Sequence, residues 1–190
     1  IINIKKGNII ESKNAYLQHI DNVLNLKCID KDKIKSKKLK VVVDTVNGAA
    51  FKALPDLLEK LNCDVIKIHC QNTGDFPRGT EPIPSHLGSL SKAVREEKAD
   101  IGFATDPDAD RLAIVDNHGN PIGEESTLVI ALESYLKYYQ DSQKVVTNLS
   151  TSMAVDVIAH KYNSTVQRSS VGEINVVEKM KELNSSIGGE

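Results

Sequence analysis

The segment ADIGFATDPDADRLAIVD, residues 99–116, decides the fold of this chain. An apolar run precedes a loop rich in carboxylates and a second apolar run follows it, so we expect strands at 100–104 and 112–115. Outward from this segment, short β-branched runs alternate with loops and amphipathic helices along the rest of the chain. Such alternation is typical of an α/β layer fold with a largely parallel sheet.

The flanking sequence supplies the other elements of this pattern. Ser12 fits the N-cap of a first helix, and the lysine-rich stretch 27–40 fits a solvated linker better than a basic binding strip. The further elements that we expect are a strand at 40–44, a helix through Leu54 to Leu61, a strand at 64–69, a polar loop at 71–84, a helix through Leu87 to Val94, helices at 128–139, 151–162 and 173–183, and strands at 144–147, 165–168 and 186–187.

The pattern restarts after a turn at 116–120, which indicates a domain boundary at that point. We therefore expect a linker at 1–11 and then a three-layer α/β/α domain with a mixed, largely parallel sheet at 12–120. Residues 121–190 are expected to form a second, partial domain of the same kind. The chain opens without an initiator Met and ends at Gly188-Gly189-Glu190, so we expect it to be a piece of a longer polypeptide.

The composition is that of an ordinary soluble globular protein, with 40% hydrophobic and 26% charged residues. The 24 Lys and Arg nearly balance the 26 Asp and Glu, which argues against a nucleic acid or an anionic membrane as partner. No apolar run approaches the roughly 18 to 20 residues of a membrane span. The three cysteines include no CxxC pair, so we expect no disulfide framework and no zinc cluster, and a cytoplasmic location with reduced thiols.

The carboxylates of the opening segment carry the sharpest chemical signal. Asp106, Asp108 and Asp110 alternate at a period of two, which turns all three side chains to one side of an extended or gently curved segment. Their mutual repulsion calls for raised pKa values or a bound cation. Oxygen ligands favour a hard divalent cation such as Mg²⁺, and the planar guanidinium of Arg111 suits a phosphate oxygen.

Other interpretations of this loop are a solvated acidic loop that binds nothing and an EF-hand. The EF-hand fails because Arg111 stands where that motif needs Gly and Asn117 stands where it needs a bidentate Glu. Placement at the end of a parallel strand, where open α/β sheets bind ligands, favours a site. A second strand-end loop at 44–48 gives a weak signal, because backbone amides at a helix start can hold a phosphate but a tight turn explains it equally well.

Six segments occur in a characteristic order: KVVVDTVNGAA, GDFPRGTEPIP, the carboxylate segment, VVTNLSTS, SVGEINVVEKM and a terminal IGGE. In this order and spacing the chain resembles the α-D-phosphohexomutase family, which includes phosphoglucomutase, phosphomannomutase and phosphoglucosamine mutase. The resemblance covers nearly the whole chain from Ser12 onward. The carboxylate segment is its specific part, and each of the other segments is weak by itself.

The resemblance implies a four-domain enzyme that interconverts hexose 1-phosphate and hexose 6-phosphate through a phosphoserine. In the family, the four domains supply in turn the phosphoserine, the metal loop, a sugar-recognition loop and a phosphate-binding loop. This chain resembles the second domain and the start of the third. Its partners would be the hexose phosphate substrate and the first and fourth domains of the same polypeptide, and alone it would be inactive.

The resemblance also implies roles for individual residues. Asp106, Asp108 and Asp110 would bind Mg²⁺, which also touches the phosphoserine. Arg111 would act as a catalytic residue beside the transferred phosphoryl group. Glu190 matches the Glu that opens the family's sugar-binding loop, and it would accept hydrogen bonds from sugar hydroxyls.

Two departures limit this transfer. Some relatives carry a Lys or Arg in the segment that corresponds to 148–153, as proton carrier or phosphate ligand, and none stands there in this chain. Some relatives have His where this chain has Glu173, which either lines the substrate cleft or is a helix-start carboxylate favoured by the helix dipole. With the terminal IGGE, these features favour a phosphoglucosamine-mutase-like or archaeal-type branch. The alternative function is a non-catalytic module that binds a metal or a sugar phosphate.

Overall fold

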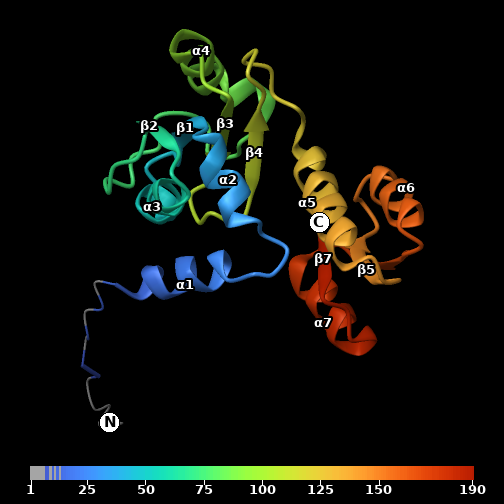
Figure 1. The fold of residues 1–190 in the computed structure, drawn as a ribbon. Helices are drawn as coiled ribbons and strands as arrows, with labels where there is room; N and C mark the ends of the chain where they lie inside the picture. The colour runs from blue at the N-terminus through green and yellow to red at the C-terminus, as the bar shows by residue number, and fades with distance from the viewer. Residues whose placement is uncertain (1–6, 9, 11, 13) are drawn as a thin grey trace, which may run out of the picture.

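The structure, a computed structural model, describes residues 7, 8, 10, 12 and 14–190. Within these residues the chain forms two α/β units, each built on its own sheet (Figure 1). The arrangement confirms the expected fold class, an α/β domain with a mixed, largely parallel sheet followed by a second unit of the same kind. Most of the linker expected at 1–11 lies outside the described residues.

The first unit is a four-stranded sheet with strand order β2-β1-β3-β4. β1 runs parallel to β2 and to β3, whereas β4 runs antiparallel to β3. Its elements are α1 (Ala15–Leu24), α2 (Lys31–Lys37), β1 (Lys40–Asp44), the 3₁₀ turn η1 (Ala49–Phe51), α3 (Ala53–Lys60), β2 (Asp64–Ile68), the 3₁₀ turn η2 (Pro84–His86), α4 (Gly88–Glu97), β3 (Ile101–Thr105) and β4 (Leu112–Val115).

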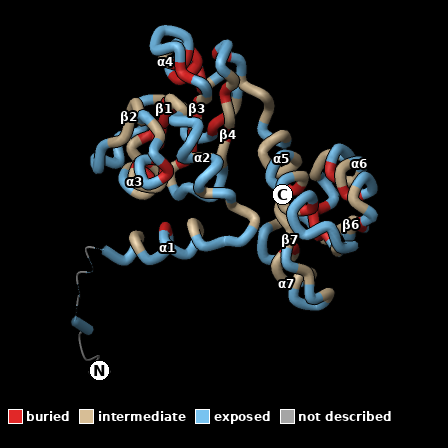
Figure 2. Tube along the Cα trace, in the orientation of Figure 1, coloured by how far each residue is buried: buried red, intermediate tan, exposed pale blue. Residues whose placement is uncertain are grey.

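The side chains of β1 alternate between the two faces of this sheet. Val41 and Val43 pack with Leu58 of α3 on one face. Val42 packs with Leu90 of α4 on the other face. Figure 2 shows the buried residues concentrated on the strands and on the helix faces that cover them. The continuous apolar run of β1 therefore has a helical layer on both sides, as a central parallel strand requires.

The second unit has a parallel three-stranded sheet with strand order β6-β5-β7. Leu132 of α5 and Val155 of α6 pack with Val145 of β5 in one core cluster. Among the helices that the structure describes, none combines the length and the apolar character that a membrane crossing needs. Its elements are α5 (Glu124–Tyr139), β5 (Lys144–Asn148), α6 (Ala154–Lys161), β6 (Thr165–Ser169), α7 (Glu173–Leu183) and β7 (Ile187–Gly189).

The lysine-rich stretch 27–40 is not the linker that its composition predicts, because Lys31–Lys37 form α2. The Asp30 carboxylate caps this helix by accepting a hydrogen bond from the Lys33 backbone N–H at 2.9 Å. An Asp at this position satisfies one of the free amides of a first turn, and lysines have a fair helix propensity. The interpretation of 27–40 as a linker considered only the charges of the stretch and did not take into account that Asp30 can cap a helix.

The cap expected for the first helix is also wrong. The helix begins at Ala15, and Asn14 occupies the N-cap position without a side-chain hydrogen bond to the first turn. Ser12 lies upstream of that position, so its hydroxyl is not the cap of α1.

The parallel strands bring several polar residues to one edge of the first sheet. Asp44, at the end of β1, pairs in register with Ile68 of β2 and with Ala104 of β3. The residues that follow, His69 after β2 and Asp106 after β3, therefore lie near the Asp44 end of β1. This is the carboxyl edge at which open α/β sheets bind ligands.

Candidate metal centre

The acidic loop, residues 106–111, continues directly from the carboxyl end of β3. Asp106 is 3% exposed, whereas Asp108 and Asp110 are exposed. One carboxylate oxygen from each of these three residues lies within 4.8 Å of the other two. The structure therefore brings together the three carboxylates that the sequence places at a period of two.

Two backbone contacts hold the acidic loop in shape. The Ala109 N–H donates to the Asp106 carbonyl at 3.2 Å, and Ala109 has a φ of 67°, which is uncommon for a residue other than Gly. The Pro107 carbonyl accepts a hydrogen bond from the Ala49 N–H at 2.7 Å. A Cβ on Gly48 would lie 2.4 Å from that same carbonyl oxygen. Gly48 is therefore required for the close approach between the two loops.

Arg111 stands at the end of the acidic loop with a half-exposed side chain. Its Nη1 lies 3.3 Å from Glu81 Oε1, and its Nε lies 3.4 Å from Asp106 Oδ2 and 3.8 Å from Asp110 Oδ1. The hydrogen bond to the Glu81 carboxylate raises the pKa of the Arg111 guanidinium above its ordinary value. Arg111 is thus a fixed cation beside the carboxylates, and a guanidinium fork suits phosphate oxygens.

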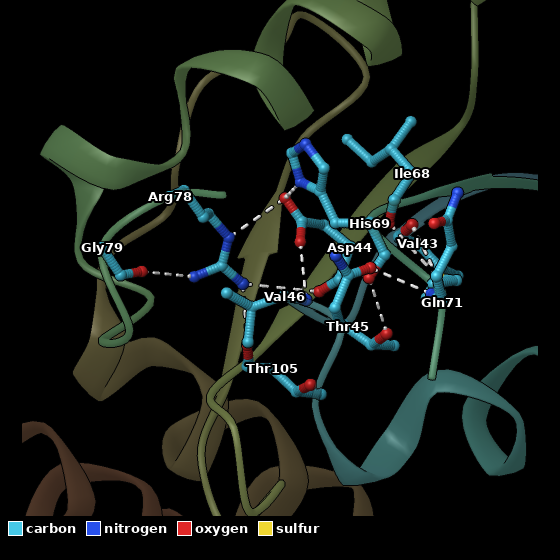
Figure 3. A network of polar contacts seen from close by, with 12 residues as sticks. Val43, Asp44, Thr45, Val46, Ile68, His69, Gln71, Arg78, Gly79 and Thr105 are labelled. Atoms are coloured by element: carbon cyan, nitrogen blue, oxygen red, sulfur yellow. Dashed lines mark hydrogen bonds and ion pairs between the residues drawn. The ribbon is translucent and has the colours of Figure 1, made fainter. Parts of the chain in front are cut away.

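A buried network of polar contacts around Asp44 and Arg78 lies at the same edge of the sheet and reaches Thr105, the last residue before the acidic loop (Figure 3). Asp44 is completely buried, and its Oδ2 accepts from Arg78 Nε at 3.0 Å and contacts His69 Nδ1 at 3.0 Å. The same guanidinium donates to the Thr105 carbonyl at 2.7 Å and to the Gly79 carbonyl at 3.0 Å. A buried carboxylate needs such partners, because an unpaired buried charge is strongly unfavourable.

The loop after β1 does not form the phosphate cradle that a strand-end loop can provide. The backbone N–H groups of residues 46–49 already have acceptors within the chain, so these four are not available to an anion. The four amides and their acceptors are Val46 to Asp44 Oδ1, Asn47 to the His69 carbonyl, Gly48 to the Thr45 carbonyl and Ala49 to the Pro107 carbonyl.

The donor set of the acidic loop fits a hard divalent cation. Three carboxylates supply oxygen ligands only, which Mg²⁺ and Ca²⁺ prefer, and a three-ligand set leaves coordination positions for water or a phosphate. At about 4 Å, two like unit charges repel by roughly 1 kcal/mol in water and roughly 4 kcal/mol near a protein surface. Within the part of the chain that the structure describes, Arg111 pairs with Asp106 and Asp110, and Asp108 has no ion pair, so the charge of the three carboxylates is only partly balanced.

The predicted sugar-binding residue Glu190 lies at the end of the second sheet. Its Oε2 accepts a hydrogen bond from Asn148 Nδ2, at the end of β5, and another from the Gly172 N–H at 3.1 Å. Asn148 Oδ1 in turn accepts from the backbone and side chain of Ser150 and Thr151. The Glu190 carboxylate is therefore oriented by neutral donors from two neighbouring elements.

Glu173, the other predicted substrate residue, is the first residue of α7 and is exposed. Gly172, which precedes it, has a φ of 115° and donates to Glu190. A carboxylate in the first turn of a helix interacts favourably with the helix dipole. The structure thus places Glu173 in the first turn of α7, one residue from a contact of Glu190.

The segment 148–153 carries no basic residue, but a guanidinium from another strand contacts it. Arg168 of β6 donates to the Asn148 carbonyl at 3.0 Å and to the Thr151 carbonyl at 2.7 Å. It also pairs with Asp156 of α6. The sequence neighbourhood of the segment gives no sign of this contact, because the partner comes from the adjacent strand.

Residues that the sequence analysis did not single out complete the first site. Arg78 and Glu81 lie in the Gly- and Pro-rich loop 71–84, whose segment GDFPRGTEPIP carries part of the family resemblance but gave neither residue a role. The sequence signal for this network was Asp44. It is a carboxylate at the end of an apolar strand, and a carboxylate buried there needs a cationic partner. Which cation it finds depends on the path of the long loop, and a single sequence does not specify that path.

Two family models match the chain. Residues 14–119 match the model described as phosphoglucomutase/phosphomannomutase, alpha/beta/alpha domain II. Residues 123–190 match the model of domain III of the same family.

Curated relatives align along most of the chain. A protein of Thermococcus kodakarensis named phosphoglucomutase/phosphomannomutase is 34% identical over 98% of this chain. A phosphoglucosamine mutase of Campylobacter hominis is 37% identical over 80% of this chain. The chain spans 39% and 34% of the lengths of these two relatives.

Solved structures share the fold. A phosphoglucomutase/phosphomannomutase family protein from Burkholderia thailandensis superimposes with a TM-score of 0.72 at 23% identity. The superposition covers 90% of this chain and 37% of that protein. At this level of identity the likeness concerns the fold alone.

Proposed function

Because the chain belongs to the phosphoglucomutase/phosphomannomutase family, we propose that it forms the metal-binding part of a phosphohexomutase. The reaction is the interconversion of hexose 1-phosphate and hexose 6-phosphate, an intramolecular phosphotransfer of the isomerase class. The observation that carries the proposal is the convergence of three carboxylates at the carboxyl end of β3. The match of both units to consecutive domains of one family supports it.

In this proposal Asp106, Asp108 and Asp110 hold Mg²⁺ through carboxylate oxygens. A cation bound there neutralises charge on phosphoryl oxygens, and phosphoryl transfer depends mainly on such neutralisation and on positioning. Arg111, already fixed by Glu81, binds an oxygen of the transferred phosphoryl group. The rest of the first unit keeps these groups in place at the edge of the sheet.

The second unit recognises the sugar. Glu190 accepts hydrogen bonds from sugar hydroxyls, since a carboxylate has acceptor capacity beyond the two donors that orient it. Glu173, in the exposed first turn of α7, lines the same side of the substrate site. The hexose phosphate would therefore contact both units, with its phosphoryl group at the first and its ring at the second.

The remaining parts of the reaction come from outside this chain. The chain spans about two fifths of the length of its relatives, and a phosphoserine has to be supplied by another domain of the same polypeptide. We therefore propose that the isolated chain binds Mg²⁺ but does not turn over substrate. A cytoplasmic location with reduced cysteines is part of the same proposal, as is the absence of nucleic-acid and membrane partners.

Kinetics on the protein encoded by the complete gene test this function. With glucose 1-phosphate, mannose 1-phosphate and glucosamine 1-phosphate as substrates, one of the three should be isomerised in the presence of Mg²⁺. Asp108→Asn should lower kcat by a factor of about 10² to 10³, as the loss of one charge-stabilising group does in other enzymes. Glu190→Gln should mainly raise KM, because it weakens contacts to the sugar ring.

Each of two outcomes would overturn one part of the proposal. Robust isomerisation by the isolated 190-residue chain would show that no further domain is needed. A complete gene that encodes no further domain, together with Mg²⁺ or sugar-phosphate binding and no turnover, would favour the alternative of a non-catalytic binding module.

A further inference from the structure

The polar loop that follows β2 brackets the acidic loop at both of its ends. Arg78 donates to the carbonyl of Thr105, the residue directly before Asp106, at 2.7 Å. Three positions further along, the Glu81 carboxylate lies 3.3 Å from the guanidinium of Arg111, which closes the acidic loop. One short segment of the chain therefore contacts the acidic loop where it begins and where it ends.

The side chain of Arg78 is almost completely buried, with 5% exposed, and every arm of its guanidinium is used. Nε binds the Asp44 carboxylate at 3.0 Å, Nη1 donates to the Gly79 carbonyl at 3.0 Å and Nη2 donates to the Thr105 carbonyl at 2.7 Å. Figure 3 shows the guanidinium pointing from its own loop toward Asp44 and Thr105. Only a planar fork makes these contacts at once, and a lysine ammonium does not reproduce that geometry.

The hydrogen bond from Arg78 to the Thr105 carbonyl also restricts the orientation of Asp106, the first carboxylate of the triad. The Thr105 carbonyl and the Asp106 N–H belong to one planar peptide unit. A bond that fixes the carbonyl direction therefore fixes the plane from which Asp106 leaves the strand. Asp106 then accepts the backbone N–H of Arg111 at its Oδ1, at 3.1 Å, so the orientation is passed to the far end of the loop.

We propose that Arg78 is a positioning residue for the metal site, acting on Asp106 through the Thr105 carbonyl. The consequence for metal binding rests on the proposed function. The consequence for the geometry of the acidic loop is independent of the proposed function. Balancing the charge of Asp44 needs only the Nε contact, to which His69 adds a second partner at 3.0 Å. The Nη2 donor is what ties this buried ion pair to the acidic loop.

The test uses the 190-residue chain and Mn²⁺ as a paramagnetic probe of the Mg²⁺ site. Binding is followed by electron paramagnetic resonance, with Mg²⁺ as competitor, in the parent and in Arg78→Lys. Groups that orient metal ligands change affinity by about 10- to 100-fold when they are lost, so Arg78→Lys should raise the Mn²⁺ Kd by roughly tenfold or more. Arg95→Lys is the matched control, because Arg95 also donates to a backbone carbonyl, that of Gly119 at 3.2 Å. This control should leave the Kd unchanged.

A second measurement follows the conformation of the acidic loop in the absence of metal. Hydrogen exchange of the Arg111 amide, which donates to Asp106, should speed up in Arg78→Lys while the amides of the second sheet keep their parental rates. The double variant Asp44→Asn/Arg78→Met removes both buried charges together and so avoids a stranded carboxylate. It should show the same loss of protection at Arg111.

The outcomes separate this inference from the proposed function. Parental Mn²⁺ affinity and parental Arg111 exchange in the Arg78 variants would overturn the positioning role and leave the metal site intact. If the parent chain itself binds no Mn²⁺, the metal function fails, and Arg111 exchange alone then decides whether Arg78 positions the loop. A weakened affinity with unchanged Arg111 exchange would also contradict the stated route through Thr105.

Discussion

The carboxyl edges of the two sheets are built alike but are charged differently. Each edge has an arginine that donates to more than one backbone carbonyl, Arg78 to three at the first sheet and Arg168 to two at the second. Each arginine also pairs with a carboxylate. At the first edge the partner, Asp44, is completely buried, whereas at the second edge the side chain of Asp156 is 35% exposed.

The two edges also differ in the net charge of the residues near these arginines. At the first edge three carboxylates lie close together, and the Arg111 guanidinium pairs with two of them, Asp106 and Asp110, and with Glu81. The second edge gives the one carboxylate of Glu190 two neutral donors, Asn148 and the Gly172 amide. A surplus of negative charge favours a cation, whereas an oriented carboxylate with spare lone pairs favours a hydroxyl donor. The same scaffold can therefore carry two kinds of recognition through a few strand-end residues.

The largest expected difference between the two edges is in stability. Arg78→Ala strands the buried Asp44 carboxylate and should lower the free energy of unfolding by about 3–5 kcal/mol. Arg168→Ala should cost about 1–2 kcal/mol, because Asp156 is partly exposed and water can replace part of the lost hydrogen bonding. Urea denaturation followed by NMR signals from each sheet measures both. Equal losses would contradict the difference in burial on which the comparison depends.

A smaller effect should follow from the contact between loops at the first edge. A Cβ at position 48 would lie 2.4 Å from the Pro107 oxygen, so Gly48→Ala forces the acidic loop to move. Overpacking of this kind costs about 1–3 kcal/mol. Gly88→Ala is the control, since a Cβ there has no neighbour within 4 Å and the residue lies in α4. The control should be neutral or stabilising by up to about 1 kcal/mol.

The same denaturation curves give the check on Gly48. If Gly48→Ala were as stable as the parent, the acidic loop would not be held against the loop after β1. The close packing of the first edge, and with it the pre-organised carboxylate triad, would then be in doubt.

Much of the first sheet was predictable from the sequence because its signals are local. The strand at 40–44 and the strand at 112–115 have the predicted bounds, since apolar runs that end at charged or turn residues fix both ends. The helix at 173–183 also begins and ends as predicted, directly after Gly172. The approach of the three carboxylates was predicted from their spacing in an extended or gently curved segment, but it is a turn at Ala109, with a φ of 67°, that shapes the loop which brings them together.

The supporting network could not be predicted in the same way. The partners of Asp44 come from positions 69 and 78, and their meeting depends on the parallel pairing of β1 with β2 and on the path of a long loop. Likewise, Glu190 meets Asn148 only because β7 lies beside β5. The prediction of a linker at 27–40 was also wrong, because it was based on composition and did not consider that Asp30 caps α2.

The smallest expected effect concerns the turn at 116–120, which ends the first unit. Hydrogen bonds from the Asn120 N–H and the His118 N–H lower the pKa of Asp116 below its ordinary value. A lowered folded-state pKa adds stability at a pH above the unfolded value of about 3.9, and this stability is lost as the pH falls through the folded pKa. Asp116→Asn should therefore be less stable than the parent at pH 7 and approach it near pH 2.

Urea midpoints at the two pH values measure this effect. A stability difference between Asp116→Asn and the parent that stays constant across the acid range would show that the charge of Asp116 is not what holds the turn.

The central claim, that the first edge is a cation site and the second is not, is tested most directly by thermal unfolding with and without Mg²⁺. Mg²⁺ at ten times its Kd should stabilise the parent by about 1.4 kcal/mol and raise its Tm accordingly. Glu190→Gln should respond as the parent does. Asp108→Asn should start at a Tm equal to or above that of the parent, because one of three like charges is gone, and it should gain little from Mg²⁺. An equal response to Mg²⁺ in the parent and in Asp108→Asn would contradict the account.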